Sequence, residues 1–231
     1  MSSTPHTSQS KEMYVKALAE LNPRGTVAIN RLADRLGVTP VSAGEMVKRL
    51  SQTGLMQHVP YRGVHLTNEG RALGSSVLRR QRLWECFLSQ YLHIPWPRLY
   101  ELTCELEHAT DSIVTDALEA FLGFPARCPH GNPIPDAVGN LIPLEGVPLC
   151  DVQEGTSVEV IAVQERSVEI LEHLAASGLL PTARLTVLER GPLDGPLSLC
   201  FGTRTVSVGL NLAGLVLVKP LPDEEPVESD A

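Results

Sequence analysis

Residues 39–67 read TPVSAGEMVKRLSQTGLMQHVPYRGVHLT, and this stretch decides the fold of the first part of the chain. Thr39 followed by Pro40 is a typical helix start, because a threonine side chain caps exposed N–H groups and proline fits the first helical position. Gly54 is a typical helix end. The residues after it form two short strand-like runs around a Tyr61-Arg62-Gly63 turn. The stretch therefore predicts a helix followed by a β-hairpin.

The residues before this stretch predict two more helices. In KEMYVKALAELNP the apolar residues recur at intervals of three and four, and the run stops at Asn22-Pro23. AINRLADRLGV predicts a second helix that ends at Gly37. Three helices followed by a hairpin are typical of a winged helix-turn-helix, which is predicted here over residues 1–74.

In a winged helix-turn-helix the third helix enters the major groove of DNA and the hairpin touches the backbone. We expect base contacts from the start of the helix and phosphate contacts from basic side chains. The candidate DNA-binding residues are Thr39, Pro40, Ser42, Glu45, Lys48, Arg49 and Arg62. The alternative is that the domain docks a protein, in which case Lys48 and Arg49 belong to an ordinary solvated face.

The distribution of charge favours DNA, although the net charge of the chain is −8. Twelve Lys/Arg and five Asp/Glu lie in residues 1–82, against seven and twenty-two in the rest of the chain. A basic front on an acidic body is typical of a protein that faces nucleic acid with one domain.

The length of 231 residues indicates more than one domain. No run of 18 apolar residues predicts a membrane span, and the first residues lack the basic and apolar regions of a signal peptide. We therefore expect a cytoplasmic protein without a membrane partner. Its five cysteines form no CxxC pair, which in a reducing compartment indicates free thiols or metal ligands.

Residues 70–92 predict a long helix that Pro95 and Pro97 bring to an end, and residues 98–122 predict a second one. The apolar stripe of this second helix consists of Leu99, Leu102, Leu106, Ala109, Ile113, Ala117 and Phe121. Cys104, Glu107 and His108 lie opposite it, at a spacing that lets one helical turn bring them together. Sulfur, oxygen and nitrogen donors together suit Fe(II), Co(II), Ni(II) or Zn(II). The alternative is a cysteine that merely belongs to the core.

These segments resemble the diphtheria toxin repressor family of metal-dependent transcriptional regulators. The likeness runs from about Lys11 to Pro135, with a weaker continuation to Lys219, and rests on EMYVKAL, RRQRLWECFL, CELEH and CPHGNPIP. It implies that Met13 joins Cys104, Glu107 and His108 as ligands of one activating metal ion. The thioether and thiolate favour Fe(II) over Mn(II), whose sensors in this family have oxygen ligands at these two positions.

The chain departs from the resemblance at a second metal site that iron-sensing members have. Its matching positions here are Gln81, Glu85 and Tyr100, so only one carboxylate is kept. Gln81, Glu85 and Glu165 are the candidates for a second site, with a surface or ion-pairing role as the alternative for Glu85. Cys128 and His130 lie in the CPHGNPIP loop, whose glycine and prolines predict a rigid turn, and are interpreted as structural with metal binding as the alternative.

The last third of the chain changes to short β-runs with one helix near residues 167–179. It resembles the small SH3-like barrel of ferrous-iron-transport accessory proteins. The predicted fold is therefore α+β, with a winged helix-turn-helix at 1–74, a helical dimerisation and metal-binding domain at 75–140, a linker at 141–154, an SH3-like β-barrel at 155–220 and an acidic disordered tail at 221–231.

We expect a repressor that Fe(II) activates to bind, as a homodimer, palindromic operators of iron-uptake genes. The dimer is predicted to form through the helices between Gly70 and Leu122. A Mn(II)-responsive regulator and a metal-handling adaptor that does not bind DNA are the alternatives. An enzyme or a small organic substrate is not expected, because no residue orients His108 as a base, and the chain has neither a phosphate-binding loop nor an oxyanion hole near Cys104.

Overall fold

The computed structural model describes residues 9–22 and 25–222. The predicted acidic tail lies, from residue 223 onward, outside the described residues. In the described part, no helix has the length and apolar character needed to cross a membrane. The described residues divide into two units, the first made of residues 9–22, 25–84, 102–125 and 134–142 and the second of residues 85–101, 126–133 and 143–222.

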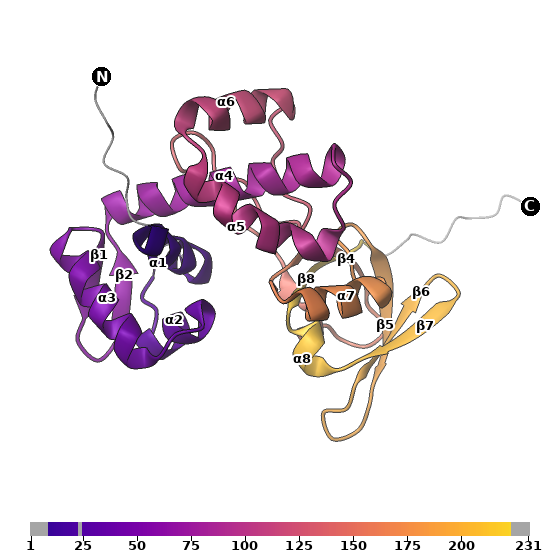
Figure 1. Ribbon diagram of the computed structural model, residues 1–231. Coiled ribbons are helices and arrows are strands. Elements are labelled where there is room, and N and C mark those ends of the chain that lie inside the picture. The colour runs from indigo at the N-terminus through magenta and orange to yellow at the C-terminus, as the bar shows by residue number, and fades with distance from the viewer. Residues whose placement is uncertain (1–8, 23–24, 223–231) are drawn as a thin grey trace, which may run out of the picture. The chain divides into compact units, whose positions relative to one another are not determined.

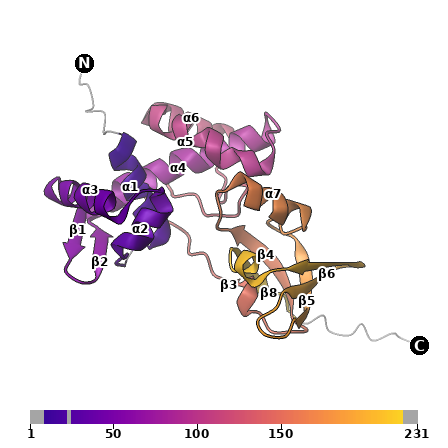
Figure 2. The same ribbon diagram turned by 60° about the horizontal axis from the view of Figure 1, so that its bottom comes forward.

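The first unit begins with the predicted winged helix-turn-helix. Its elements are α1 (Gln9–Leu21), α2 (Ile29–Leu36), α3 (Pro40–Gln52), β1 (Met56–Val59) and β2 (Gly63–Leu66). The three helices enclose a core to which Leu18, Leu32 and Leu50 contribute fully buried side chains. Figures 1 and 2 show α3 next to the β1–β2 hairpin, which forms the wing.

The local signals in residues 39–67 act as predicted. The Thr39 hydroxyl oxygen accepts a hydrogen bond from the Ser42 N–H (3.2 Å) and caps α3. β1 and β2 pair antiparallel with Met56 opposite Leu66, and both of these side chains are buried. Tyr61, at the tip of the turn, has a positive φ of 63° and is fully exposed. The wing therefore presents Tyr61 and Arg62 to solvent.

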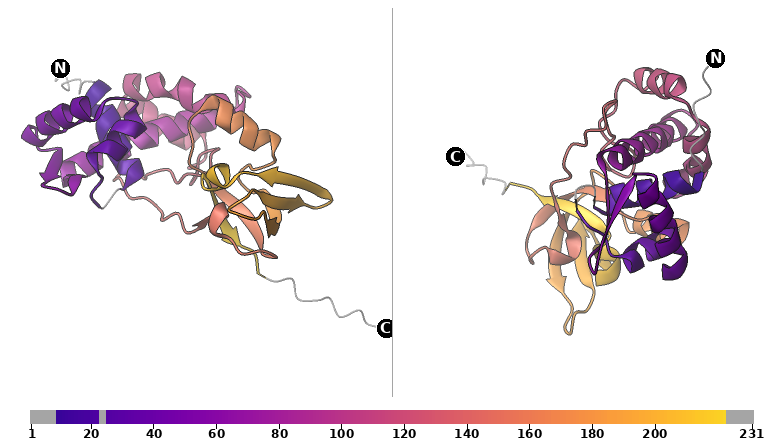
Figure 3. Two further views of the ribbon diagram at one scale, coloured as in Figure 1. Left: turned by 90° about the horizontal axis from the view of Figure 1, so that it is seen from below. Right: turned by 90° about the vertical axis from the view of Figure 1, so that its left-hand side faces the viewer.

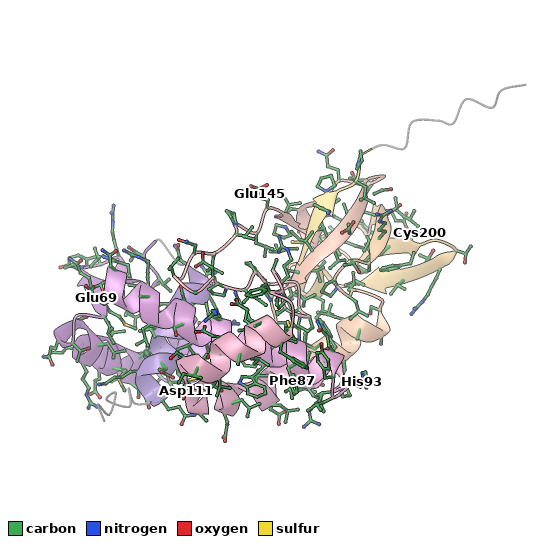
Figure 4. The ribbon with its side chains drawn as sticks, turned by 90° about the horizontal axis from the view of Figure 1, so that it is seen from above. Glu69, Phe87, His93, Asp111, Glu145 and Cys200 are labelled. Carbon is green, nitrogen blue, oxygen red and sulfur yellow. The ribbon has the colours of Figure 1, made fainter. Side chains whose placement is uncertain are left out.

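The prediction of one helix over residues 98–122 is wrong, because the chain forms α5 (Leu99–Ala109) and α6 (Ser112–Phe121). The break lies at Asp111, whose carboxylate accepts a hydrogen bond from the Val114 N–H (2.9 Å) and starts a new helix. Figure 4 marks Asp111 at this turn. The preceding helix, α4 (Asn68–Gln90), ends before the prolines as expected.

The apolar stripe predicted for this region is largely not the buried face, although its first residue, Leu99, is fully buried. Leu102, Ile113 and Phe121 are 41%, 77% and 58% exposed. Glu107, on the opposite face, is fully buried. The reason is that the polar face of α5 packs against α1, where ion pairs replace apolar contacts.

The second unit is built on a six-stranded antiparallel sheet with the order β3-β8-β4-β5-β6-β7. The strands are β3 (Val147–Pro148), β4 (Ser157–Val163), β5 (Arg184–Arg190), β6 (Leu197–Phe201), β7 (Arg204–Val208) and β8 (Val216–Pro220). Helix α7 (Val168–Ala176) follows β4, and the short α8 (Leu210–Ala213) precedes β8. Figure 3 shows the β6–β7 hairpin projecting from the rest of the sheet.

The sheet begins earlier than the predicted barrel. β3 pairs with β8 and is followed by a single 3-10 turn, η2 (Leu149–Asp151), in which Leu149 is fully buried. These residues lie inside the segment predicted as a linker. A second 3-10 turn, η1 (Trp96–Arg98), belongs to the same unit, and its Trp96 packs against the core of the sheet.

Candidate metal centre

The four predicted ligands lie on two helices of the first unit, with Met13 on α1 and Cys104, Glu107 and His108 on α5. The Met13 sulfur is 4.0 Å from the Cys104 sulfur, and His108 Nε2 is 3.3 Å from Glu107 Oε1. The donors therefore form a sulfur pair between α1 and α5 and a nitrogen–oxygen pair within α5.

His108 is oriented by a residue that the sequence did not single out. Its Nδ1 is hydrogen-bonded to a carboxylate oxygen of Glu12, whose other oxygen pairs with Arg80 Nη2 at 3.1 Å. A carboxylate on Nδ1 fixes the proton there and leaves Nε2 as the lone-pair donor, the arrangement that metal-binding histidines usually have. The sequence contained one indication of this role, because Glu12 is the residue next to Met13, the ligand that the resemblance implies on this helix.

Two buried polar atoms of this site show that the residues fit a metal ion. His108 Nε2 and Glu107 Oε2 are both shielded from solvent and have no hydrogen-bond partner among the residues that the structure describes. A buried polar atom without a partner is costly, and a cation bound between these atoms would remove that cost.

The Cys104 thiol holds its proton more tightly than an ordinary cysteine does. Burial raises the pKa of the Cys104 thiol, the Lys16 ammonium group lowers it, and the carboxylates of Glu107 and Glu105 raise it. Since a metal ion binds the thiolate, binding at Cys104 must release a proton.

Lys16 is the unexpected member of the site. Its Nζ lies 2.5 Å from Glu107 Oε1, and both side chains have no solvent-accessible surface. Burial raises the pKa of Glu107, and the neighbouring Lys16 opposes that shift. Lys16 is one of the twelve basic residues counted in residues 1–82, and its burial means that it adds nothing to an exposed basic surface.

A second group of donors lies in the other unit. Glu85, Cys128 and His130 are all buried, and one ligand atom from each lies within 4.8 Å of the other two. Within residues 9–22 and 25–222 this is the one set of three His, Cys, Asp or Glu residues that meets this criterion. His130 Nδ1 is 3.2 Å from Glu85 Oε2, while His130 Nε2 is buried and has no hydrogen-bond partner in the described part of the chain.

The backbone of the CPHGNPIP loop holds these donors in place. The Cys128 N–H donates to the Asn132 carbonyl (2.9 Å), and the His130 carbonyl accepts from the Val163 N–H of β4 (2.9 Å). Gly131 has a φ of +82°, and a Cβ there would lie 2.0 Å from the Ile161 carbonyl oxygen. The rigid turn expected from the sequence is therefore present, and it carries two donors toward Glu85.

The other residues considered for a second site have different surroundings. Glu165 Oε1 accepts hydrogen bonds from the Arg166 and Ser167 N–H groups, just before α7. Gln81 is buried on α4, and the ring of Tyr100 lies under the Arg166 guanidinium group at 4.2 Å. Of the three candidates only Glu85 belongs to the buried donor group. Cys128 and His130, interpreted from the sequence as structural, are its two partners, and their short Cys-x-His spacing is the signal that could have indicated them.

Cys200 belongs to neither of these two groups of donors. It lies on β6, as Figure 4 shows, and its thiol donates to the Gly202 carbonyl at 3.1 Å.

The predicted DNA-binding residues form an exposed surface. Thr39, Pro40, Ser42, Glu45, Lys48, Arg49 and Arg62 are all solvent-exposed. The Thr39 hydroxyl also donates to Ser42 Oγ (2.9 Å), so this residue already serves as the helix cap. Arg79 and Arg80 turn inward to carboxylates, as Lys16 does, and the positive charge of this surface comes from α3 and the wing.

Three family models match successive parts of the chain. The N-terminal DNA-binding domain of iron-dependent repressors matches residues 6–64, and their metal-binding and dimerisation domain matches residues 67–136. The FeoA domain matches residues 147–220. This third match begins at β3, in agreement with the observed start of the sheet.

The chain is similar over most of its length to characterised proteins. It is 29% identical over 221 residues to the iron-dependent repressor IdeR of Mycobacterium tuberculosis, covering 90% of this chain and 96% of that protein. It is 31% identical over 159 residues to the diphtheria toxin repressor of Corynebacterium efficiens, covering 66% and 69%. A manganese-dependent transcriptional repressor in complex with manganese shares its fold, with a TM-score of 0.82 and 30% identity over 91% of this chain and all of the other. The chain therefore belongs to the family of metal-dependent, DNA-binding transcriptional repressors that includes the diphtheria toxin repressor.

Proposed function

We propose that this protein is a repressor that Fe(II) activates to bind, as a homodimer, palindromic operators of genes for iron uptake and homeostasis. Its iron-dependent relatives and the exposed residues of α3 and the wing support DNA binding under metal control. We further propose that it acts in the cytoplasm, where its DNA target is.

The observation that carries the proposal is the placement of the donors on α1 and α5. Helix α1 belongs to the core of the winged helix through Leu18, while α5 lies outside that core. A bound ion would supply a cross-link between the two helices, because its ligands come from both. The affinity gained for DNA on binding metal must then equal the affinity gained for metal on binding DNA.

The chemistry of the donors supports iron. Met13 and Cys104 offer soft sulfur atoms, which favour Fe(II), Co(II), Ni(II) or Zn(II) over Mn(II). Manganese is kept as the second candidate because a structural relative is a manganese-dependent repressor.

Exposed apolar side chains support a dimer formed by the helical region. Five large apolar side chains on α5, on α6 and just after α6 are exposed to solvent: Leu102, Ile113, Val114, Phe121 and Phe124. Clusters of exposed apolar side chains mark protein interfaces more often than free surface. The match of residues 67–136 to a dimerisation domain agrees with this location.

We propose Glu85, Cys128 and His130 as a second metal site of the same protein. The closeness of the three donors and the unpartnered His130 Nε2 support it. This assignment keeps Glu85 from the sequence-based candidates and adds the two loop residues.

The decisive experiment is a DNA-binding titration with chelator-treated protein. Anaerobic Fe(II) is expected to produce binding to a palindromic promoter fragment, with Mn(II) weaker at equal concentration. Cys104→Ala and His108→Ala are expected to abolish the metal response, and Cys200→Ala is the matched control because Cys200 lies on β6. Wild-type DNA binding that does not depend on metal would refute the proposal.

A further inference from the structure

Lys16 lies within the proposed metal site and none of the proposed ligand roles explains it. Its ammonium group is completely buried and contacts Glu107 Oε1 at 2.5 Å. The same oxygen is 3.3 Å from His108 Nε2. One carboxylate oxygen is therefore shared by a buried cation and by the nitrogen that is best placed to bind a metal.

Helix geometry places Lys16 on the ligand-bearing face of α1. Lys16 lies four residues after Glu12 and three after Met13, the spacings of neighbours on one helix face, so it shares a face with Met13 and with Glu12, the partner of His108. All three side chains reach toward α5, where Met13 meets Cys104, Glu12 meets His108 and Lys16 meets Glu107. Each of the three contacts joins a side chain of α1 to a side chain of α5, but Lys16 is the α1 residue that brings a positive charge.

A buried carboxylate needs a compensating charge, because it is costly without one. Lys16 provides that charge to Glu107 in the structure. A divalent ion bound at Glu107 Oε2 would provide it as well, but two cations on the two oxygens of one buried carboxylate repel each other strongly at such short range. An ion that binds Glu107 must therefore move the ammonium group or tolerate it.

We propose that Lys16 competes with the activating metal ion for Glu107. Because the ammonium group of Lys16 already pairs with this carboxylate, it sets the metal concentration that the protein needs for activation. The inference rests on the proposed metal site at Met13, Cys104, Glu107 and His108. It explains why a positive side chain is buried among donors that suit a cation.

The test measures metal affinity directly, by competition of the full-length protein with a chromophoric chelator for Co(II) and, without oxygen, for Fe(II). Lys16→Met removes the charge and keeps the length of the side chain, and it is expected to lower the dissociation constant by about tenfold or more. Lys11→Met removes a charge from the same helix outside the ligand face and is expected to leave the constant within about twofold. Lys16→Arg keeps the charge and is expected to stay near the wild type.

Loss of the ion pair also leaves Glu107 uncompensated, so chelator-treated Lys16→Met is expected to have a lower Tm than the wild type. Saturating Co(II) is then expected to raise the Tm of the variant more than that of the wild type. Lys16→Gln is the second variant, because its amide still donates to Glu107 without carrying a charge. It too is expected to bind metal more tightly.

The results separate the two proposals. If Lys16→Met and Lys16→Gln bind Co(II) no more tightly than the wild type, while Cys104→Ala and His108→Ala lose it, the competition is refuted and the metal site stands. If Cys104→Ala and His108→Ala keep the wild-type affinity, the metal site itself is refuted, and the role of Lys16 with it.

Discussion

Glu12 offers a test of how the metal-binding histidine is prepared. Its carboxylate holds His108 Nδ1 on one oxygen and Arg80 on the other, and the residue is almost fully buried. We expect replacement of Glu12 to weaken metal binding without removing any ligand. The reason is that the carboxylate fixes the tautomer and ring orientation of His108 and makes Nε2 a stronger donor.

The structure allows the size of the effect to be graded between two variants. Loss of a hydrogen-bonding partner of a metal-binding histidine costs about 10- to 100-fold in affinity, or about 1.4 to 2.7 kcal/mol. Glu12→Gln keeps an oxygen that accepts the Nδ1 proton and loses only the charge, so about tenfold is expected. Glu12→Ala loses both and also strips Arg80 of its ion-pair partner, so the loss is expected near about 100-fold.

The assay is chelator competition with Co(II), together with the metal concentration that gives half-maximal DNA binding. Both quantities should shift by the same factor, because metal and DNA binding are linked. Glu20→Gln is the matched control, since Glu20 lies on the same helix and pairs with Arg35 at 3.2 Å. An affinity of Glu12→Ala within about twofold of the Glu20→Gln value would refute the role assigned to Glu12.

Three further predictions concern other parts of the molecule. Arg62→Ala should weaken binding to all DNA sequences alike and reduce the slope of log K against log salt by about one, as measured by anisotropy; an effect on one operator alone would contradict a phosphate contact. Gly131→Ala should lower the free energy of unfolding by more than about 1–3 kcal/mol in a urea titration, because the new Cβ adds a clash with the Ile161 carbonyl to the strain of a positive φ. Gly123→Ala has a φ of +73° but no atom near the new Cβ, so it should show the cost of the positive φ alone. Burial raises the pKa of Cys86 to about 12, so its thiol should resist iodoacetamide at neutral pH, and rapid alkylation of native Cys86 would be the contrary result. Because the folded state keeps this proton to a higher pH than the unfolded state, the free energy of unfolding should fall as the pH rises from about 9 toward 12, and less steeply in Cys86→Ala.

Local sequence signals predicted the winged helix and the strands well. Thr39, Gly37 and Gly54 act on neighbouring backbone, so their effect is readable without knowledge of the rest of the chain. The apolar periods of α1 and α4 likewise gave these helices nearly their observed bounds. The break at Asp111 was missed because a strong helical period continues across it, and only the capping hydrogen bond to Val114 starts a new helix.

The candidate sites were predicted less completely. The motif on α5 indicated three donors and the resemblance added Met13, but neither identified Glu12 or Lys16 as their partners. Lys16 entered the charge balance of residues 1–82, and a lysine is nearly always exposed, so its burial against the Glu107 carboxylate could not be foreseen. Glu85 and the Cys-x-His loop were seen separately, and nothing in the sequence joined positions more than 40 residues apart.

The sequence by itself determined the elements of the winged helix, the basic residues of α3 and the wing, and the chemical kinds of donor available to a metal, since these depend on residue type and on neighbours a few positions away. The tertiary structure alone decided which donors meet. It set Glu12 on His108, Lys16 on Glu107, and Cys128 and His130 beside Glu85. Each of these contacts joins distant segments, and its strength comes from burial, which removes water as the competing partner and which only the packed fold creates.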